Sequence, residues 1–383
     1  MSQRVLVTGG AGFIGSFVCE RLLARGCAVR VLDNLDPQVH QGARPVLPPG
    51  IEFLQADIRD GAACARALEG VDVVVHAASA VGIGQSLYRI RHFIDVNTTG
   101  TATLLDTLVA RRQSVKLVAL TSMTGYGEGV YERPSDGRLL RIDPRTADAV
   151  ERFGWEPVCP VTHEVLVPRP TPEASELMCR NVYALSKRHQ EELALALGAT
   201  YGFPVACLRL FNVFGPRQSL SNPYTGVIAI FLSRLLAGEP PLVYEDGRQT
   251  RDFVSVHDVV DAVMAAIDSP EVHGQVVNIG SGVGRRIADV ATALARLVGR
   301  EDLAPQVSHR FRSGDIRHCT ADISRARQLL QFQPRVAWED GLAEVVQWAR
   351  SAPSVDRVLE AERELAARGL VGVPDTAPHG ADR

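Results

Sequence analysis

Tyr183 and Lys187 stand four residues apart in the segment Ala174–Leu197, whose pattern predicts a helix. Residues at this spacing share one helix face, so the phenol and the ammonium would be neighbours. A tyrosine with a pKa of about 10 is a poor base at neutral pH, but a nearby positive charge favours the phenolate. The pair could therefore take a proton from a hydroxyl group. An exposed helix pair without a catalytic role has the same spacing, so the hypothesis needs further support.

Ser122 is a third candidate for this chemistry. It follows Lys116–Thr121, an apolar run that predicts a strand, and opens the stretch Ser122–Gly127. Ligands of open α/β sheets bind beyond the carboxyl ends of the strands, so Ser122 would face such a cleft. Its hydroxyl could hold the oxygen that Tyr183 deprotonates.

Three glycines, Gly9, Gly12 and Gly15, follow the apolar run Arg4–Val7 and lead into the helical pattern Phe13–Arg25. The first permits a tight turn, the second lets the backbone approach a pyrophosphate, and the third lets the helix lie close to the sheet. The helix N-terminus offers N–H groups to phosphates. This pattern predicts a dinucleotide site.

Asp33 ends the second apolar run, 18 residues after Gly15. A carboxylate there can bind a ribose diol and would repel a 2′-phosphate, so NAD is favoured over NADP. The alternative is an ordinary turn with a solvated aspartate.

Other candidates follow later strands. Asp57 and Ile58 could contact an adenine edge, or Asp57 could cap a helix before Arg59. Ala77 and Ala78 are small enough to lie under a cofactor. Asn97 could link to the cofactor region or only cap the next helix.

Apolar runs alternate with helical patterns in the first half of the chain, as in an α/β protein with a doubly wound parallel Rossmann sheet. The runs are nearly continuous, as expected of strands covered on both faces. The predicted strands are Arg4–Val7, Ala28–Leu32, Ile51–Gln55, Val71–His76, Lys116–Thr121 and Val205–Leu210.

The domain prediction has three parts. Residues 1–215 form an NAD-binding domain, interrupted by a Pro- and Arg-rich insertion at 128–175 with weak periodicity, and 252–280 returns to it. Residues 216–350 form a smaller, discontinuous mixed α/β substrate domain. Residues 351–383 hold an amphipathic helix, Val355–Leu370, and a disordered tail, Gly372–Arg383.

The composition excludes several classes of protein. The 383 residues carry 41 Lys and Arg against 44 Asp and Glu, a net charge of −3, which argues against a nucleic-acid binder. Neither a signal peptide nor a membrane span is predicted. The seven scattered cysteines fit reduced thiols in a cytoplasmic protein. Cys159 and His163 are too few ligands for zinc, so we expect surface loop residues and no metal.

The chain resembles the extended short-chain dehydrogenase/reductase family, in its branch of NAD-dependent nucleotide-sugar epimerases and dehydratases. The resemblance spans roughly residues 4–350. It rests on the segments Thr8–Gly15, Asp33-Asn34, Asp57, His76–Ala78, Asn97, Ser122–Gly127, Tyr183–Lys187, Arg209–Pro216, Gly247–Val254 and Arg312–Arg317.

The resemblance implies roles for further residues. It assigns Phe13, Ile14 and Asn34 to the cofactor. It assigns Thr124, Asn212, Arg251, Arg312 and Arg317 to a nucleotide-diphosphate sugar, for which guanidinium groups are suited. Each arginine could instead form a surface ion pair. The resemblance also implies a homodimer through a four-helix bundle of Asn97–Arg112 and Ala174–Leu197, unless their apolar faces are internal core.

The residues after Ser122 narrow the reaction. Dehydratases of this branch have an Asp-Glu pair there and related decarboxylases a glutamate, but this chain has Met123 and Thr124. The resemblance therefore points to 4-epimerisation through a 4-keto sugar. Tyr183 stands 61 residues after Ser122, and this spacing, with Trp155–Pro160 and Ser221–Val227, is most similar to the dTDP-L-rhamnose 4-epimerase subgroup.

Several alternatives remain open. The substrate could be a UDP-hexose, a UDP-N-acetylhexosamine or UDP-glucuronate. A second enzyme class is an NAD(P)H-dependent 4-ketoreductase. A non-enzymatic alternative is an NAD-sensing scaffold, against which the presence of Ser122, Tyr183 and Lys187 together argues.

Overall fold

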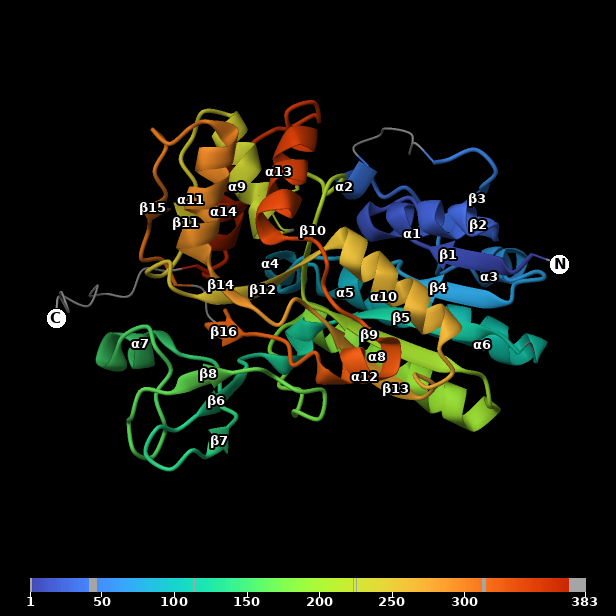
Figure 1. Ribbon diagram of the computed structural model, residues 1–383, viewed down its shortest axis with the longest axis horizontal. Helices are drawn as coiled ribbons and strands as arrows, with labels where there is room; N and C mark the ends of the chain where they lie inside the picture. Colours follow the sequence, from blue (N-terminus) through green and yellow to red (C-terminus); the bar gives the residue numbers. More distant parts are fainter. Residues whose placement is uncertain are drawn as a thin grey trace.

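A computed structural model describes residues 2–40, 47–112, 114–222, 224, 226–311 and 315–371 (Figure 1). The predicted tail, Gly372–Arg383, therefore lies outside the described residues. Within them, no helix is long and apolar enough to cross a membrane.

The main sheet has seven parallel strands in the order β13-β9-β5-β4-β1-β2-β3. All six predicted strands are present with ends shifted by at most two residues, and β13 is added from the segment 252–280. The doubly wound parallel sheet is confirmed. The strands are β1 Arg4–Thr8, β2 Ala28–Asp33, β3 Glu52–Gln55, β4 Val73–His76, β5 Lys116–Ser122, β9 Val205–Leu210 and β13 Gln275–Ile279.

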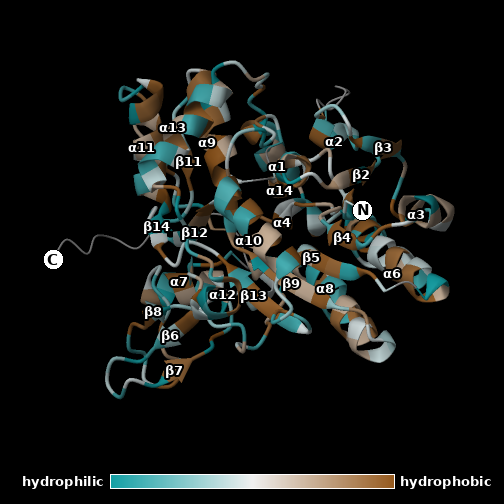
Figure 2. Ribbon diagram, turned by 45° about the vertical axis from the view of Figure 1, so that its right-hand side comes forward, coloured by the Kyte–Doolittle hydropathy of each residue, from teal (hydrophilic) through white to brown (hydrophobic). Residues whose placement is uncertain are grey.

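Helices cover both faces of this sheet, which explains why the middles of its strands are mostly apolar on both sides. Val5 and Val7 point into one core, whereas Leu6 between them points into the other. Figure 2 shows both hydrophobic and hydrophilic residues on α10, as expected of a helix with one buried face. One face carries α1 Phe13–Ala24, α10 Val256–Asp268 and α12 Ser324–Leu330, and the other α3 Gly61–Ala67, α6 Gly100–Arg111 and α8 Val182–Tyr201.

Two helices begin elsewhere than predicted. The helix expected from Ala174 begins at Val182, because the Asn181 side chain accepts a hydrogen bond from the Ala184 N–H and caps it. The helix expected from Asn97 is preceded by a π-helical stretch, Ile94–Thr99, and becomes α-helical only at Gly100. Short π-helical stretches are rare and frequently occur at functional sites.

A second, smaller region has its own core of α9 Val227–Leu236, α11 Ile287–Val298 and α13 Trp338–Ala349. The C-terminal helix α14 spans Val358–Ala366 and is shorter than predicted. The strands of this region are β10 Asn212–Phe214, β11 Leu242–Val243, β12 Thr250–Ser255, β14 Gly284–Arg286, β15 Gln306–Val307 and β16 His318–Cys319. The domain boundaries themselves stay a prediction.

The insertion has more structure than its weak periodicity suggests. Strands β6 Val130–Glu132, β7 Leu139–Leu140 and β8 Val167–Arg169 form a small antiparallel sheet, joined by α7 Ala147–Phe153 (Figure 1). Cys159 is 1% exposed and packs against Tyr131 and Leu166. The expectation that it is a surface residue is wrong, because the insertion has an apolar core of its own.

Candidate active site

A cavity of about 440 Å³ lies at the carboxyl ends of the sheet strands. It brings together most of the residues that the sequence singled out. The predicted residues that line it are Gly9, Gly12, Phe13, Ile14, Gly15, Asp33, Asn34, Asp57, Ile58, Ala77, Ala78, Ser122, Thr124, Tyr183, Lys187 and Asn212.

The glycine-rich turn forms one end of the cavity. Gly9 has a φ of +68°, and a Cβ there would lie 2.7 Å from the Ala78 nitrogen. A Cβ on Gly15 would lie 2.2 Å from the carbonyl oxygen of Gly9, so only glycine lets α1 begin this close to β1. Gly12 is less crowded, because a Cβ there would lie 3.3 Å from its nearest neighbour, the carbonyl oxygen of Gly9. The turn therefore forms a cradle at a helix N-terminus, which fits a pyrophosphate.

Asp33 stands at the end of β2 beside this turn. Its Oδ2 accepts a hydrogen bond of 3.0 Å from Ala11 N–H, and its Oδ1 accepts one of 2.9 Å from Leu35 N–H. The side chain is thus fixed at the cavity wall rather than solvated. A carboxylate held there suits a ribose diol and opposes a 2′-phosphate, so these residues fit NAD.

Asp57 and Asn34 lie together at the same end. The Asn34 amide donates to Asp57 Oδ2 at 3.0 Å, and Arg59 pairs with the same carboxylate at 2.8 Å. The Arg59 hydrogen bond, above all, lowers the pKa of Asp57 well below its usual range. Asp57 therefore both lines the cavity and anchors Arg59, whereas Asp60 caps α3.

Ser122 and Tyr183 occupy the middle of the cavity. Ser122 ends β5, and its hydroxyl oxygen accepts a hydrogen bond of 3.0 Å from the Thr124 hydroxyl. Tyr183 lies in the first turn of α8, only 8% exposed. Burial raises the pKa of Tyr183, and a hydrogen bond with the Ser122 side chain opposes this rise.

Lys187 lies one turn further along α8. Its ammonium nitrogen is 2.7 Å from the carbonyl oxygen of Leu120, and burial lowers its pKa to about 7. Burial therefore disfavours charge on both side chains, which opposes the predicted acidification of Tyr183 by Lys187. An oxidised nicotinamide in the cavity would add positive charge that favours the phenolate, and the acidification itself stays a prediction.

Asn97 lies behind the cavity wall. Its amide nitrogen donates to Ala80 O at 3.0 Å and to the Ser186 hydroxyl at 2.9 Å, while its oxygen accepts from Ala80 N–H at 2.7 Å. It makes no helix-cap hydrogen bond, so the capping alternative is wrong. Asn97 instead joins the cavity-lining residue Ala80 to α8.

Two of the predicted substrate arginines, Arg251 and Arg317, are not part of the cavity lining. Arg251 donates to the carbonyl oxygens of Thr250 and Arg317, at 2.8 and 3.3 Å. Arg312 lies outside the described residues. The substrate roles of these arginines stay predictions.

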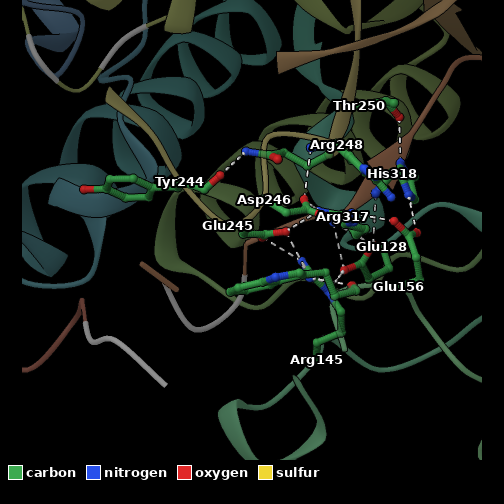
Figure 3. A network of polar contacts seen from close by, with 12 residues as sticks. Glu128, Arg145, Glu156, Tyr244, Glu245, Asp246, Arg248, Thr250, Arg317 and His318 are labelled. Carbon is green, nitrogen blue, oxygen red and sulfur yellow. Dashed lines mark hydrogen bonds and ion pairs between the residues drawn. The ribbon is translucent and has the colours of Figure 1, made fainter. Parts of the chain in front are cut away.

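Arg317 is fully buried in a charge network between the insertion and the second region (Figure 3). Its guanidinium pairs with Glu245 at 2.8 Å, with Asp246 at 2.6 Å and with Glu156 of the insertion. Arg145, also of the insertion, pairs with Glu245 at 2.9 Å. The contacts of the Arg317 guanidinium are thus with three carboxylates rather than with the cavity.

Several polar residues of the cavity were not predicted from the sequence. Gln38 and Gln85 follow the ends of β2 and β4, and their amides bond at 2.8 Å across the cavity wall. Because both glutamines follow strand ends, where ligands bind in such sheets, their positions could have predicted that they line the cavity. Other polar lining residues that were not predicted include Asp36, His40, His92, Gln218 and Ser219.

Comparison with known proteins identifies the family. The model of the NAD dependent epimerase/dehydratase family matches residues 5–149 and 160–280. The dTDP-L-rhamnose 4-epimerase of Burkholderia thailandensis is 37% identical over 365 residues, covering 93% of this chain and 96% of that protein.

Two solved structures share the fold. UDP-glucose 4-epimerase of Thermotoga maritima with UDP-glucose has a TM-score of 0.74 at 28% identity, covering 91% of this chain and 99% of the other. UDP-glucose 4-epimerase of Thermus thermophilus with NAD has a TM-score of 0.69 at 30% identity, covering 92% and 100%. With its glycine cradle, Asp33 and the cavity tyrosine and lysine, this chain belongs to the NAD-dependent epimerase/dehydratase family of nucleotide-sugar enzymes.

Proposed function

We propose that the chain is an NAD-dependent nucleotide-sugar 4-epimerase that interconverts dTDP-L-rhamnose and dTDP-6-deoxy-L-talose. The observation that carries the proposal is the meeting of Ser122, Tyr183 and Lys187 in one cavity with the glycine cradle. The similarity to the Burkholderia enzyme over nearly the whole chain supports the choice of sugar.

Tyr183 is the base in this reaction. It takes the proton of the C4 hydroxyl, while Ser122 hydrogen-bonds the same oxygen. NAD, held by the glycine cradle and Asp33, would supply the acceptor and donor for the C4 hydride, and its oxidised form would add positive charge near the phenol. The flat 4-keto sugar turns over in the cavity, and Tyr183 returns the proton after the opposite face is reduced. The cycle consumes no reductant.

The residues beside Ser122 argue against elimination of water or carbon dioxide. Met123 is 4% exposed and has no acidic group. The Thr124 hydroxyl is bonded to Ser122 and is no general acid at neutral pH. The described contacts therefore leave proton transfer to Tyr183.

Asn212 is the best-supported substrate ligand outside this group. Its buried Oδ1 finds no hydrogen-bond partner within the described part of the chain, although it lines the cavity. A buried acceptor without a partner is costly, and a sugar or ribose hydroxyl would satisfy it. Thr124, Arg251 and Arg312 remain proposed ligands, and Arg317 is the least suited, given its carboxylate partners.

A homodimer remains part of the proposal with less support. Leu104, Leu105 and Leu108 of α6 pack against the sheet, as the internal-core alternative requires. Leu185 and Tyr201 of α8 are 40% and 57% exposed and could face a second copy. Light scattering, which measures the molar mass in solution, distinguishes a monomer from a dimer.

The test is a panel of dTDP- and UDP-sugars incubated with catalytic NAD, with products identified by NMR. We expect inversion at C4 of dTDP-L-rhamnose and no net reduction of cofactor. Turnover of UDP-hexoses alone would instead indicate a UDP-hexose 4-epimerase. A product formed only with stoichiometric NADH would indicate a ketoreductase. The variant Tyr183→Phe should retain NAD but lose about a thousandfold or more in kcat.

A further inference from the structure

Gln190 is a fully buried glutamine on α8, three residues after Lys187. Its side-chain oxygen lies 2.6 Å from the Lys187 ammonium nitrogen. Its side-chain nitrogen lies 2.6 Å from Nε2 of His76, at the end of β4, and 3.1 Å from the Thr101 hydroxyl. One carboxamide thus joins the lysine to the end of β4 and to α6.

The hydrogen-bonding capacities of these groups fix their orientation. Lys187 can only donate, so the glutamine atom that faces it is the oxygen. The amide nitrogen then faces His76 and can only donate, so Nε2 of His76 accepts and carries no proton. The imidazole proton is therefore on Nδ1, which donates to the Thr8 hydroxyl at 2.7 Å.

His76 is consequently a neutral partner. Burial, aided by the charge of Lys187, lowers the pKa of His76 to about 3. The titratable groups that interact electrostatically with Lys187 are His76 on β4 and Cys207 on β9. Tyr183 lies one turn earlier on the same helix and lines the same cavity. Burial keeps the Cys207 thiol protonated, because it raises its pKa well above the usual value.

We propose that Gln190 is a positioning residue for Lys187, holding the ammonium between β4 and β5 so that it faces Tyr183 and the cofactor side of the cavity. The inference rests on the proposed function and deepens it. Two of the three ammonium N–H groups are taken by the Leu120 carbonyl and the Gln190 amide. Lys187 also lines the cavity, so its third N–H can serve a ligand there.

Loss of this amide would act on Tyr183 through Lys187. The variant Gln190→Met keeps the chain length but removes the acceptor, so the buried ammonium becomes less stable and less well placed. The Tyr183 phenolate then loses part of its neighbouring positive charge. We expect the pKa of Tyr183 in the NAD-bound enzyme to rise by about one unit, because a hydrogen bond to a charged group is worth about that much.

The experiment follows the ultraviolet absorbance of the phenolate against pH in NAD-bound enzyme. Each variant is compared with its own Tyr183→Phe partner, and the difference isolates Tyr183. Thr101→Val is the matched control, since it removes the other partner of the same amide nitrogen and leaves the contact with Lys187. We expect Thr101→Val to titrate like the parent and Gln190→Met to titrate about one pH unit higher.

His76→Leu tests the contact from its other end. It removes the nearer of the two partners of the Gln190 amide nitrogen, at 2.6 Å against 3.1 Å for Thr101, so the shift should have the same direction and be smaller. The pKa of Tyr183 in the double variant of Gln190→Met and His76→Leu should equal that in Gln190→Met alone, because both changes act through the contact between Gln190 and Lys187. If Gln190→Met does not fold, the Tyr183 titration in His76→Leu alone tests the proposal.

Activity gives a second, separate readout. At neutral pH, kcat of Gln190→Met should fall about tenfold with KM for the sugar unchanged, and should recover at higher pH. An unchanged Tyr183 titration in Gln190→Met, or in His76→Leu where only that variant folds, would overturn the proposal. If the parent turns over no nucleotide sugar, the proposed function fails, whereas the titration still tests Gln190.

Discussion

Two glycines of the same turn should fail in different ways when each is changed to alanine. In Gly15→Ala the new Cβ would lie 2.2 Å from Gly9 O and 2.7 Å from Gly10 Cα, both backbone atoms that cannot rotate away. The start of α1 would have to move by about 1 Å to reach an ordinary contact distance. Overpacking of this kind costs about 2–3 kcal/mol.

Gly12→Ala is the matched comparison. Its backbone has a φ of −78°, which alanine adopts, and its Cβ would lie 3.3 Å from Gly9 O. Folding should therefore lose only about 0.5 kcal/mol, from the helix start. The added methyl group would stand where the backbone approaches a pyrophosphate, so NAD affinity should fall although the fold is kept.

Thermal unfolding with and without added NAD separates the two outcomes. Without NAD, Gly15→Ala should lower Tm by roughly 5–10 °C and Gly12→Ala by about 2 °C. Added NAD should raise Tm of the parent strongly and of Gly12→Ala hardly at all. Parent-like stabilisation of Gly12→Ala by NAD would refute the cradle, and a parent-like Tm of Gly15→Ala would refute the packing argument.

Four further substitutions test the electrostatics. The pKa of Lys187 is about 7 in the folded protein against a usual 10.5, so the unfolded chain binds the proton of this side chain more tightly. The free energy of unfolding of the parent, relative to Lys187→Met, should therefore rise by up to about 1.4 kcal/mol per pH unit from pH 7 to 10.5. Denaturant unfolding at several pH values measures this. Parallel curves would contradict this. Asp33→Ser should weaken NAD about tenfold and strengthen NADP, by titration of both, and an unchanged preference would count against the role of Asp33. Glu245→Gln should destabilise the protein by about 3 kcal/mol, whereas Glu132→Gln, at the exposed pair with Arg169, should cost about 0.5 kcal/mol or less. Equal losses in denaturant unfolding would remove the distinction.

Local patterns were enough to predict the sheet and the core of the site. Runs such as Val5–Val7 are apolar because both sheet faces are covered, and that pattern is readable without coordinates. The spacing of Tyr183 and Lys187 correctly places both in one cavity. The helix start at Val182 was missed because apolar residues from Ala174 extend the pattern, whereas the Asn181 cap is a local signal of equal weight.

Contacts between distant segments could not be predicted in this way. Gln190 and His76 are 114 residues apart, and a glutamine on a helix gives no sign of its partner. Arg317 belongs to a motif that suggested a phosphate ligand, but its charge is met by Glu156 and Glu245 from two other segments. Which charges pair depends on which distant segments the fold brings together, and the amino-acid composition does not predict that.

The network around Arg317 makes the insertion inseparable from the rest of the protein. Excising residues 128–175 would remove Glu128, Arg145 and Glu156 together and leave Glu245 and Asp246 facing a single guanidinium. Phe311 would also lose Trp155, against which its ring lies at 6.4 Å. A shortened relative, or a chimera grafted at these borders, would need compensating changes at 245, 246 and 311. The segment is thus structurally coupled to the turn and strand that it contacts.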